Sequence, residues 1–206
     1  NYSHASGYQT WVKDDYGYTE GNQTISTGTG AHAEGYKSVA GGDYSHAEGY
    51  QSSATTTYGH SEGFITIASG LASHAEGAGS TASGSTSHAE GGSTKAGGQY
   101  SHAEGQPTIA IGTASHAEGY QTTAIGNYSH SEGRSSTAFG LQSHAEGGST
   151  KATGNYSHAE GFETSATTTY AHAEGIDTLA SGSASHAEGA NSTAFGIQSH
   201  AEGGTT

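Results

Sequence analysis

The 206-residue chain has no cysteine, only five lysine or arginine residues and few large aliphatic side chains. Without cysteine it can form neither a disulfide scaffold nor a thiolate metal site. Its formal net charge of −14 would repel a phosphate backbone, so we expect no nucleic-acid partner and no anionic membrane partner. No apolar run approaches the length of a membrane span, so we expect no direct membrane insertion in this segment.

The scarcity of large apolar residues raises the question of whether the chain folds at all. Leu, Ile, Val and Phe together supply under a tenth of the residues, whereas glycine occupies 35 positions. Such a composition is typical of disordered chains, because too little apolar surface is available to offset the conformational entropy lost on folding. A folded state would therefore have to be stable without a bulky core.

A strict repeat decides this question in favour of a fold. Ser-His-Ala-Glu-Gly, or a close variant, recurs every 14 residues, and His4 and Tyr18 lie on the same grid. A disordered chain has no reason to keep this register. The regular repeats fill residues 31–206, whereas residues 1–30 form degenerate repeats that reflect either drift or a cap. We therefore expect one repeat domain over 1–206, as a fragment of a longer fibre.

The repeat divides into two similar halves, each of the form (Ser/Thr)-x-Ala-x-Gly, as in Ser115–Gly119 followed by Thr122–Gly126. Five alternating residues followed by a two-residue connection predict a short strand and a tight turn. Two such strands make one coil, and stacked coils form two parallel sheets back to back, so the fold class is an all-β, two-sheet β-solenoid with 14 residues per coil.

The small residues are the better candidates for the interior of each coil. Ser, Ala and Gly share one face of each predicted strand, whereas the variable positions include Lys95 and Lys151, which would be costly to bury. This arrangement places the histidine and glutamate side chains outside. The opposite arrangement, with the variable positions inside, remains an alternative.

Tandem units such as STAFGLQSHAEG (136–147) and TIAIGTASHAEG (108–119) resemble the head repeats of YadA-type trimeric autotransporter adhesins, also called Hep/Hag repeats. The resemblance implies a left-handed parallel β-roll, a homotrimer, and an extracellular fibre on the bacterial cell surface that binds a host-surface or matrix protein or a glycan. The SHAEG variant also resembles repeats of phage and prophage tail fibres, so the structural shaft of a virion tail fibre is the alternative function.

Two ladders of ionisable side chains follow from the repeat. On a strand, a histidine and the glutamate two residues later project from the same face, and stacking places like residues about 4.8 Å apart. Because stacked carboxylates repel, we interpret these ladders as a subunit interface in which histidine pairs with glutamate. The ladder residues are His32, Glu34, His46, Glu48, His60, Glu62, His74, Glu76, His88, Glu90, His102, Glu104, His116, Glu118, His130, Glu132, His144, Glu146, His158, Glu160, His172, Glu174, His186, Glu188, His200 and Glu202.

Chemistry on these ladders is the less favoured interpretation. A His/Glu metal-binding array is possible because both residue types ligate zinc and similar ions, but no third ligand type recurs. Catalysis is not expected, because Ser45 should point away from His46 and an active site needs one constellation rather than a repeated one. We therefore expect no enzymatic activity and no cofactor.

Aromatic residues recur beside the turns and form a second candidate site. They lie directly after the SHAEG glycine or directly before its serine. They could stack between coils or subunits, or bind a ligand through their apolar rings. The predicted ligand-binding stripe consists of Tyr36, Tyr50, Phe64, Tyr120 and Phe162.

Overall fold

The structure, a computed structural model, describes residues 2–204. Every regular element in this range is a β-strand, so no helix of the described chain could cross a membrane. The chain divides into two compact units, residues 1–104 and 105–206, which are built from the same 14-residue coil. Each coil contributes one long strand of five residues and one short strand of two.

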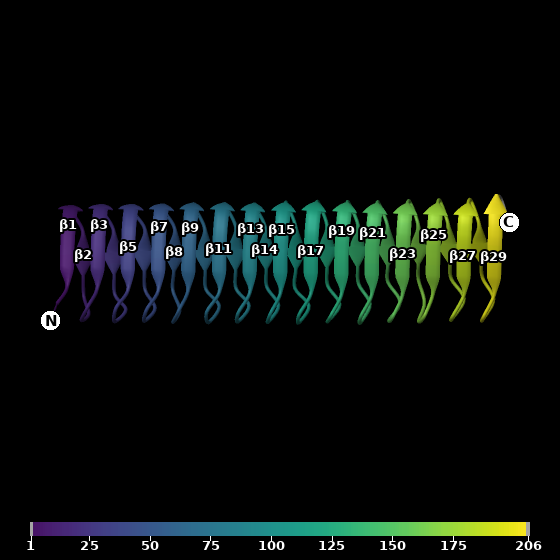
Figure 1. The fold of residues 1–206 in the computed structure, drawn as a ribbon, viewed down its shortest axis with the longest axis horizontal. Coiled ribbons are helices and arrows are strands. Elements are labelled where there is room, and N and C mark those ends of the chain that lie inside the picture. The colour runs from purple at the N-terminus through teal and green to yellow at the C-terminus, as the bar shows by residue number, and fades with distance from the viewer. Residues whose placement is uncertain (1, 205–206) are drawn as a thin grey trace. The chain divides into compact units, whose positions relative to one another are not determined.

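In the first unit, successive long strands lie side by side, as do successive short strands (Figure 1). The long strands are β1 (His4–Tyr8), β3 (Tyr18–Asn22), β5 (His32–Tyr36), β7 (His46–Tyr50), β9 (His60–Phe64), β11 (His74–Ala78) and β13 (His88–Gly92). The short strands are β2 (Trp11–Val12), β4 (Ile25–Ser26), β6 (Val39–Ala40), β8 (Ser53–Ala54), β10 (Ile67–Ala68), β12 (Thr81–Ala82) and β14 (Lys95–Ala96). Strand β15 (His102–Gln106) spans the division between the units.

The second unit repeats this arrangement. Its long strands are β17 (His116–Tyr120), β19 (His130–Arg134), β21 (His144–Gly148), β23 (His158–Phe162), β25 (His172–Ile176), β27 (His186–Ala190) and β29 (His200–Gly204). Its short strands are β16 (Ile109–Ala110), β18 (Thr123–Ala124), β20 (Thr137–Ala138), β22 (Lys151–Ala152), β24 (Ser165–Ala166), β26 (Leu179–Ala180) and β28 (Thr193–Ala194).

Within each unit, the strand pairing is parallel and keeps the 14-residue register. In the pair β7–β9, His46 lies opposite His60 and Glu48 opposite Glu62. The corners are paired as well, since the amide of Gln51 donates to the Tyr36 carbonyl at 2.8 Å. The predicted two-sheet β-solenoid is therefore confirmed, and its backbone hydrogen bonds extend through the turns.

The interior consists of small residues, as predicted. The alanines of both halves are buried, with Ala47 and Ala54 at 0% exposure. The SHAEG serine is also buried and donates a hydrogen bond across the turn, as from Ser45 Oγ to the Gly42 carbonyl at 2.7 Å. Because alanine, serine and threonine bury little apolar area, we attribute most of the stability to the backbone ladders, in which each hydrogen bond contributes about 1 kcal/mol net. The alternative with the variable positions inside is wrong.

Two details of the predicted coil are wrong. The second half-repeat forms a strand of two residues rather than five, and the long strand begins at histidine rather than serine. The SHAEG glycine does not face the interior: Gly49 is exposed and has a φ of +105°. The second-half glycine is buried as expected, as at Gly42. The positive φ turns the chain outward after the glutamate, so strict alternation of side chains ends there.

The exposed SHAEG glycines are required by close backbone packing. A Cβ built on Gly49 would lie within van der Waals overlap of the Gly63 carbonyl oxygen in the next coil, at 2.2 Å. The same approach recurs between Gly63 and Gly77. Glycine occupies this position because both the backbone conformation and the neighbouring carbonyl exclude a side chain.

The degenerate N-terminal repeats form ordinary coils. Strands β1 to β4 pair in the same 14-residue register, with His4 opposite Tyr18 and Trp11 opposite Ile25. Trp11 is 54% exposed, so its bulk is placed outside the coil and leaves the small interior unchanged.

Candidate functional site: the His–Glu face and the aromatic edges

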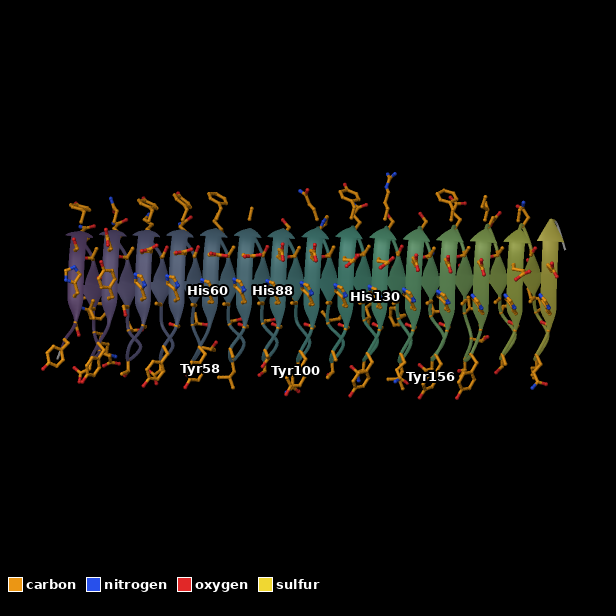
Figure 2. The ribbon with its side chains drawn as sticks, in the orientation of Figure 1. Tyr58, His60, His88, Tyr100, His130 and Tyr156 are labelled. Carbon is orange, nitrogen blue, oxygen red and sulfur yellow. The ribbon has the colours of Figure 1, made fainter. Side chains whose placement is uncertain are left out.

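The outer face of the long strands carries the ladder residues in both units; we call it the His–Glu face. Figure 2 shows His60 and His88 in the first unit and His130 in the second projecting from this face. Histidine and glutamate side chains are about one-third exposed, as in the pair His46 and Glu48 (35% and 34%). The predicted outward position of both ladders is therefore confirmed.

The histidine rings stack along each unit. In the first unit, consecutive rings from His32 to His102 have centroids 4.5–4.9 Å apart and are within 7° of parallel. In the second unit, the rings from His116 to His200 are spaced at 4.7–4.9 Å and lie within 13° of parallel. The strand spacing imposes this stack, because each ring stands on the same position of successive paired strands.

Most of the ladder histidines bring Nε2 within 4.0 Å of a glutamate carboxylate. Within one coil, the distance from Nε2 to the carboxylate is 3.7 Å for His46–Glu48 and 3.5 Å for His130–Glu132. The contacts also cross between coils of the first unit: Nε2 of His74 lies 3.7 Å from Glu62 and 3.8 Å from Glu76. Nε2 of His88 lies 3.9 Å from Glu76 and 4.0 Å from Glu90.

These contacts are not hydrogen bonds, and they become ion pairs only where the histidine is protonated. The Nε2 atoms of His46, His74 and His88 are shielded from solvent and have no hydrogen-bond partner in the described chain. Each imidazole therefore keeps one nitrogen facing carboxylate oxygens without a direct bond. The predicted pairing of histidine with glutamate occurs within the chain, both along a strand and across adjacent coils.

The pKa values shift in opposite directions in the two ladders, downward at several histidines and upward at two glutamates. Burial lowers the pKa of His74 and His88, and the charge on neighbouring stacked histidines lowers it further. These imidazoles are therefore neutral at pH 7, with a lone pair available. Hydrogen bonding to Glu62, together with desolvation, raises the pKa of Glu48 and of Glu76 to about 7. Protons on Glu48 and Glu76 thus relieve their repulsion with Glu62, whose own pKa is lowered by its hydrogen bonds to Glu76 and Glu48.

An open trough runs along the glutamate column of the first unit. It has a volume of about 720 Å³ and is lined by carboxylates and by the SHAEG glycines beside them. Its lining residues are Glu34, Glu48, Gly49, Glu62, Gly63, Glu76, Gly77, Glu90 and Gly91. Sequence reasoning missed this trough because it assigned the glycines to the interior. The repeated Glu-Gly pair is the signal that could have indicated it, since glycine beside a ladder of acids leaves the floor without side chains.

The predicted aromatic stripe is continuous only in the first unit. Tyr36, Tyr50 and Phe64, the last residues of β5, β7 and β9, stack with ring centroids 5.0 Å apart. The side chains of Tyr50 and Phe64 are 42% and 51% exposed. The structure does not bring an aromatic ring beside the other two predicted residues: Tyr120 lies opposite Arg134, and Phe162 lies opposite Gly148 and Ile176.

A second set of tyrosines lies at the corner before the SHAEG serine. Tyr44 and Tyr58 stack with ring centroids 5.6 Å apart, and Tyr156 and Tyr170 at 5.2 Å. Figure 2 shows Tyr58 and Tyr100 at the loop ends of the first unit and Tyr156 at a loop end of the second. They occupy positive φ, +59° at Tyr58, so the corner turns each ring away from the coil.

In the coil of Ser45 and His46, the serine is not placed as a nucleophile beside the histidine. The Ser45 hydroxyl is buried and donates to the Gly42 carbonyl, whereas His46 projects from the opposite side of the strand. The chemistry available on the His–Glu face is therefore ion pairing, proton sharing and ligation rather than a serine–histidine constellation.

Comparison with known proteins identifies the repeat. No curated protein matches the sequence. The family described as YadA head domain repeat (2 copies) matches residues 20–45, 103–129, 131–157 and 173–203. These segments cover more than half of the chain and lie in both units, and the 14-residue coil agrees with their spacing. The chain therefore belongs to the YadA head domain repeat family.

Proposed function

We propose that this chain acts as an extracellular, non-catalytic adhesion or receptor-binding module of a homotrimeric fibre on a bacterial surface. Family membership makes it an adhesin-head-like structural module of a kind that is typically exposed at the surface. The proposed target is a host-surface or matrix protein or a glycan. The supporting observation is the aromatic stack of half-buried Tyr36 with exposed Tyr50 and Phe64.

The stack supports binding because it lies on the outside of the coils. The interior of each coil accepts only small side chains, so these rings add nothing to the core and leave a contiguous apolar strip in water. Stacking fixes their orientation before a partner arrives, which reduces the entropy lost on binding. Aromatic side chains contribute large contact areas and are enriched at interfaces.

We place the His–Glu face at the subunit interface of the proposed homotrimer. The solvent-shielded Nε2 atoms of His46 and His60, which lack a hydrogen-bond partner in the described chain, leave bonding capacity on this face. A second chain could supply acceptors or donors there. Measuring the molar mass of the chain by light scattering tests this association state: a monomer at micromolar concentration would contradict it.

Binding is tested by comparing two matched tyrosine pairs. Tyr36→Ser with Tyr50→Ser removes two rings of the strand-end stack, and Tyr44→Ser with Tyr58→Ser removes two rings of the corner stack. We expect the first pair to abolish binding on arrays of matrix proteins and glycans, while the second pair retains it and both keep the wild-type molar mass. Loss of binding in both pairs, or in neither, would contradict the assignment to the strand-end stack.

The alternative is the structural shaft of a phage or prophage tail fibre. The in-register repetition of one coil through both units favours it, since a spacer needs length rather than a specific surface. A shaft predicts that no array target binds the wild-type chain, while the trimer forms normally.

A further inference from the structure

The His–Glu face arranges one nitrogen and two carboxylates repeatedly at near-ligand distances. In the first unit, Nε2 of His74 lies between the carboxylates of Glu62 and Glu76, at 3.7 and 3.8 Å. The next set follows in the same register, with Nε2 of His88 between Glu76 and Glu90, at 3.9 and 4.0 Å. Glu76 belongs to both sets, and it turns Oε2 toward His74 and Oε1 toward His88.

We propose that this segment binds a row of divalent transition-metal ions, of which Zn²⁺ is the reference case, with one imidazole and two bridging carboxylates around each ion. The proposal goes beyond the adhesive function and does not depend on it, but it uses the face that we place at the subunit interface, so a bound ion would occupy bonding capacity otherwise left for a second chain. The ladder of parallel rings determines which atoms could share an ion. The ligand atoms of His74, Glu76 and His88 lie within 4.8 Å of one another. The two parallel rings are 4.7 Å apart, farther than the roughly 3.4 Å between ligands of one tetrahedral ion, so we assign one histidine to each ion. Carboxylates from adjacent coils do converge on Nε2 of His74 and of His88.

The distances require only small adjustments. Zn–N and Zn–O bonds of about 2.0–2.2 Å place the ligand atoms of a tetrahedral ion roughly 3.4 Å apart. The observed separations of 3.7–3.9 Å in the His74 set and at His88–Glu76 exceed this by a few tenths of an ångström. Rotation of the partly exposed glutamate side chains can close that gap without moving the backbone.

The shared glutamates explain how ions could occupy successive coils. One carboxylate can give each of its two oxygens to a different ion, and neighbouring ions would then be separated by about one strand spacing, roughly 4.8 Å. Each bound ion would neutralise the carboxylates that otherwise repel along the column. A ligand set of N and O atoms favours Zn²⁺, Co²⁺ or Ni²⁺ over Mg²⁺ or Ca²⁺, which prefer oxygen alone.

Access also agrees with binding, whereas the proton held in the hydrogen bond between Glu62 and Glu76 must leave as an ion enters. The trough beside Glu62, Glu76 and Glu90 leaves room for the water molecules that would complete the coordination of each ion. The Nε2 atoms of His74 and His88 have no hydrogen-bond partner in the described chain that a metal would have to displace.

The experiment uses the full chain without a histidine tag, titrated calorimetrically with ZnCl₂ and separately with MgCl₂ near pH 7.5. Saturable Zn²⁺ uptake of several ions per chain is expected, with no comparable Mg²⁺ heat, and Co²⁺ should give visible d–d absorption. Equal weak binding of both metals would indicate only counterion attraction and overturn the proposal.

Matched variants locate the site. Glu76→Gln removes the bridging carboxylate, and His74→Gln removes one nitrogen ligand. Either variant should weaken the Zn²⁺ affinity of the affected coils by at least about tenfold, since even outer-shell partners of metal sites contribute 10–100-fold. Glu163→Gln removes an exposed acid outside the ladder and should leave binding unchanged. Circular dichroism checks that each variant is folded. Wild-type affinity in both ladder variants would overturn the proposal.

The outcome is distinguishable from that of the adhesive function. Array binding and molar mass are measured again in EDTA. A chain that binds Zn²⁺ but no array target supports the metal row alone, and adhesion without Zn²⁺ uptake overturns the row while leaving the adhesive function intact.

Discussion

Replacing Gly63 with alanine should destabilise the fold far more than its surface position suggests. Gly63 is exposed to solvent, so exposure alone would mark it as tolerant. Its φ is +109°, and an added Cβ would lie 2.3 Å from the Gly77 carbonyl oxygen and 3.1 Å from the Gly77 amide nitrogen. Both strands are held in register by their ladder hydrogen bonds, so neither backbone can withdraw without breaking them.

The expected magnitude has two parts. A side chain in a sparsely populated backbone region costs about 1–3 kcal/mol, and inserting a carbon into tightly packed structure costs typically about 1–3 kcal/mol more. Gly63→Ala should therefore lower the free energy of unfolding by roughly 2–6 kcal/mol. Because repeat coils contact only their neighbours, the damage should concentrate around β9 and β11.

A second glycine, Gly79, distinguishes the cost of backbone strain from the cost of steric overlap. Gly79 also has a positive φ, +71°, but an added Cβ there meets its nearest atom only at 3.6 Å. Gly79→Ala should cost about 1–2 kcal/mol, the backbone strain alone. Urea unfolding followed by circular dichroism gives both free energies, and amide exchange locates the opening. If Gly63→Ala proved no more destabilising than Gly79→Ala, the close approach of the glycine backbones would not be what excludes a side chain.

Two further perturbations test the interior and the histidine ladder. The buried Thr122 Oγ1 has no hydrogen-bond partner in the described chain, so the isosteric Thr122→Val should leave the free energy of unfolding unchanged or raise it. Ser136→Ala removes a 2.8 Å hydrogen bond to the Gly147 carbonyl and should lower the free energy of unfolding, measured in urea, by about 1 kcal/mol. A larger loss in Thr122→Val than in Ser136→Ala would contradict this. Burial and then neighbouring His144 lower the pKa of His158 from 6.5, so the unfolded state binds more protons below pH 6.5 and stability falls as the pH falls. The raised pKa values of Glu48 and Glu76 act in the opposite direction, so the test is a comparison. Between pH 7 and 5 in EDTA, the melting temperature of His158→Gln should fall less, or rise more, than that of the wild-type chain. The same change in both chains would exclude this histidine as a cause.

Much of this architecture could be predicted because the repeat restricts it so strongly. A 14-residue period that divides into two alternating halves leaves few options besides two parallel sheets, and alternation alone separates Ala47 from His46. The stacking distance of the histidines follows from the strand spacing. The ladders and their outward position were predictable for the same reason.

The remaining features depend on how consecutive coils approach one another. Periodicity could not show that Gly49 leaves the alternation at positive φ, because that conformation is required by the carbonyl of the next coil rather than by its own neighbours in sequence. The trough beside the glutamates follows from this turn. Likewise, spacing placed Tyr36, Tyr50 and Phe64 in one column, but only the structure shows that their rings stack, with centroids 5.0 Å apart. The same spacing already placed Arg134 opposite Tyr120.

The amino-acid sequence alone therefore determines the coil, its period, its small-residue interior and the existence of the His–Glu face, because each depends on contacts that recur at a constant separation along the chain. Tertiary structure decides which carboxylates face each Nε2, where glycine is obligatory and where the surface is hollowed. These depend on distances of a few tenths of an ångström between neighbouring coils, which a pattern of residue types does not specify.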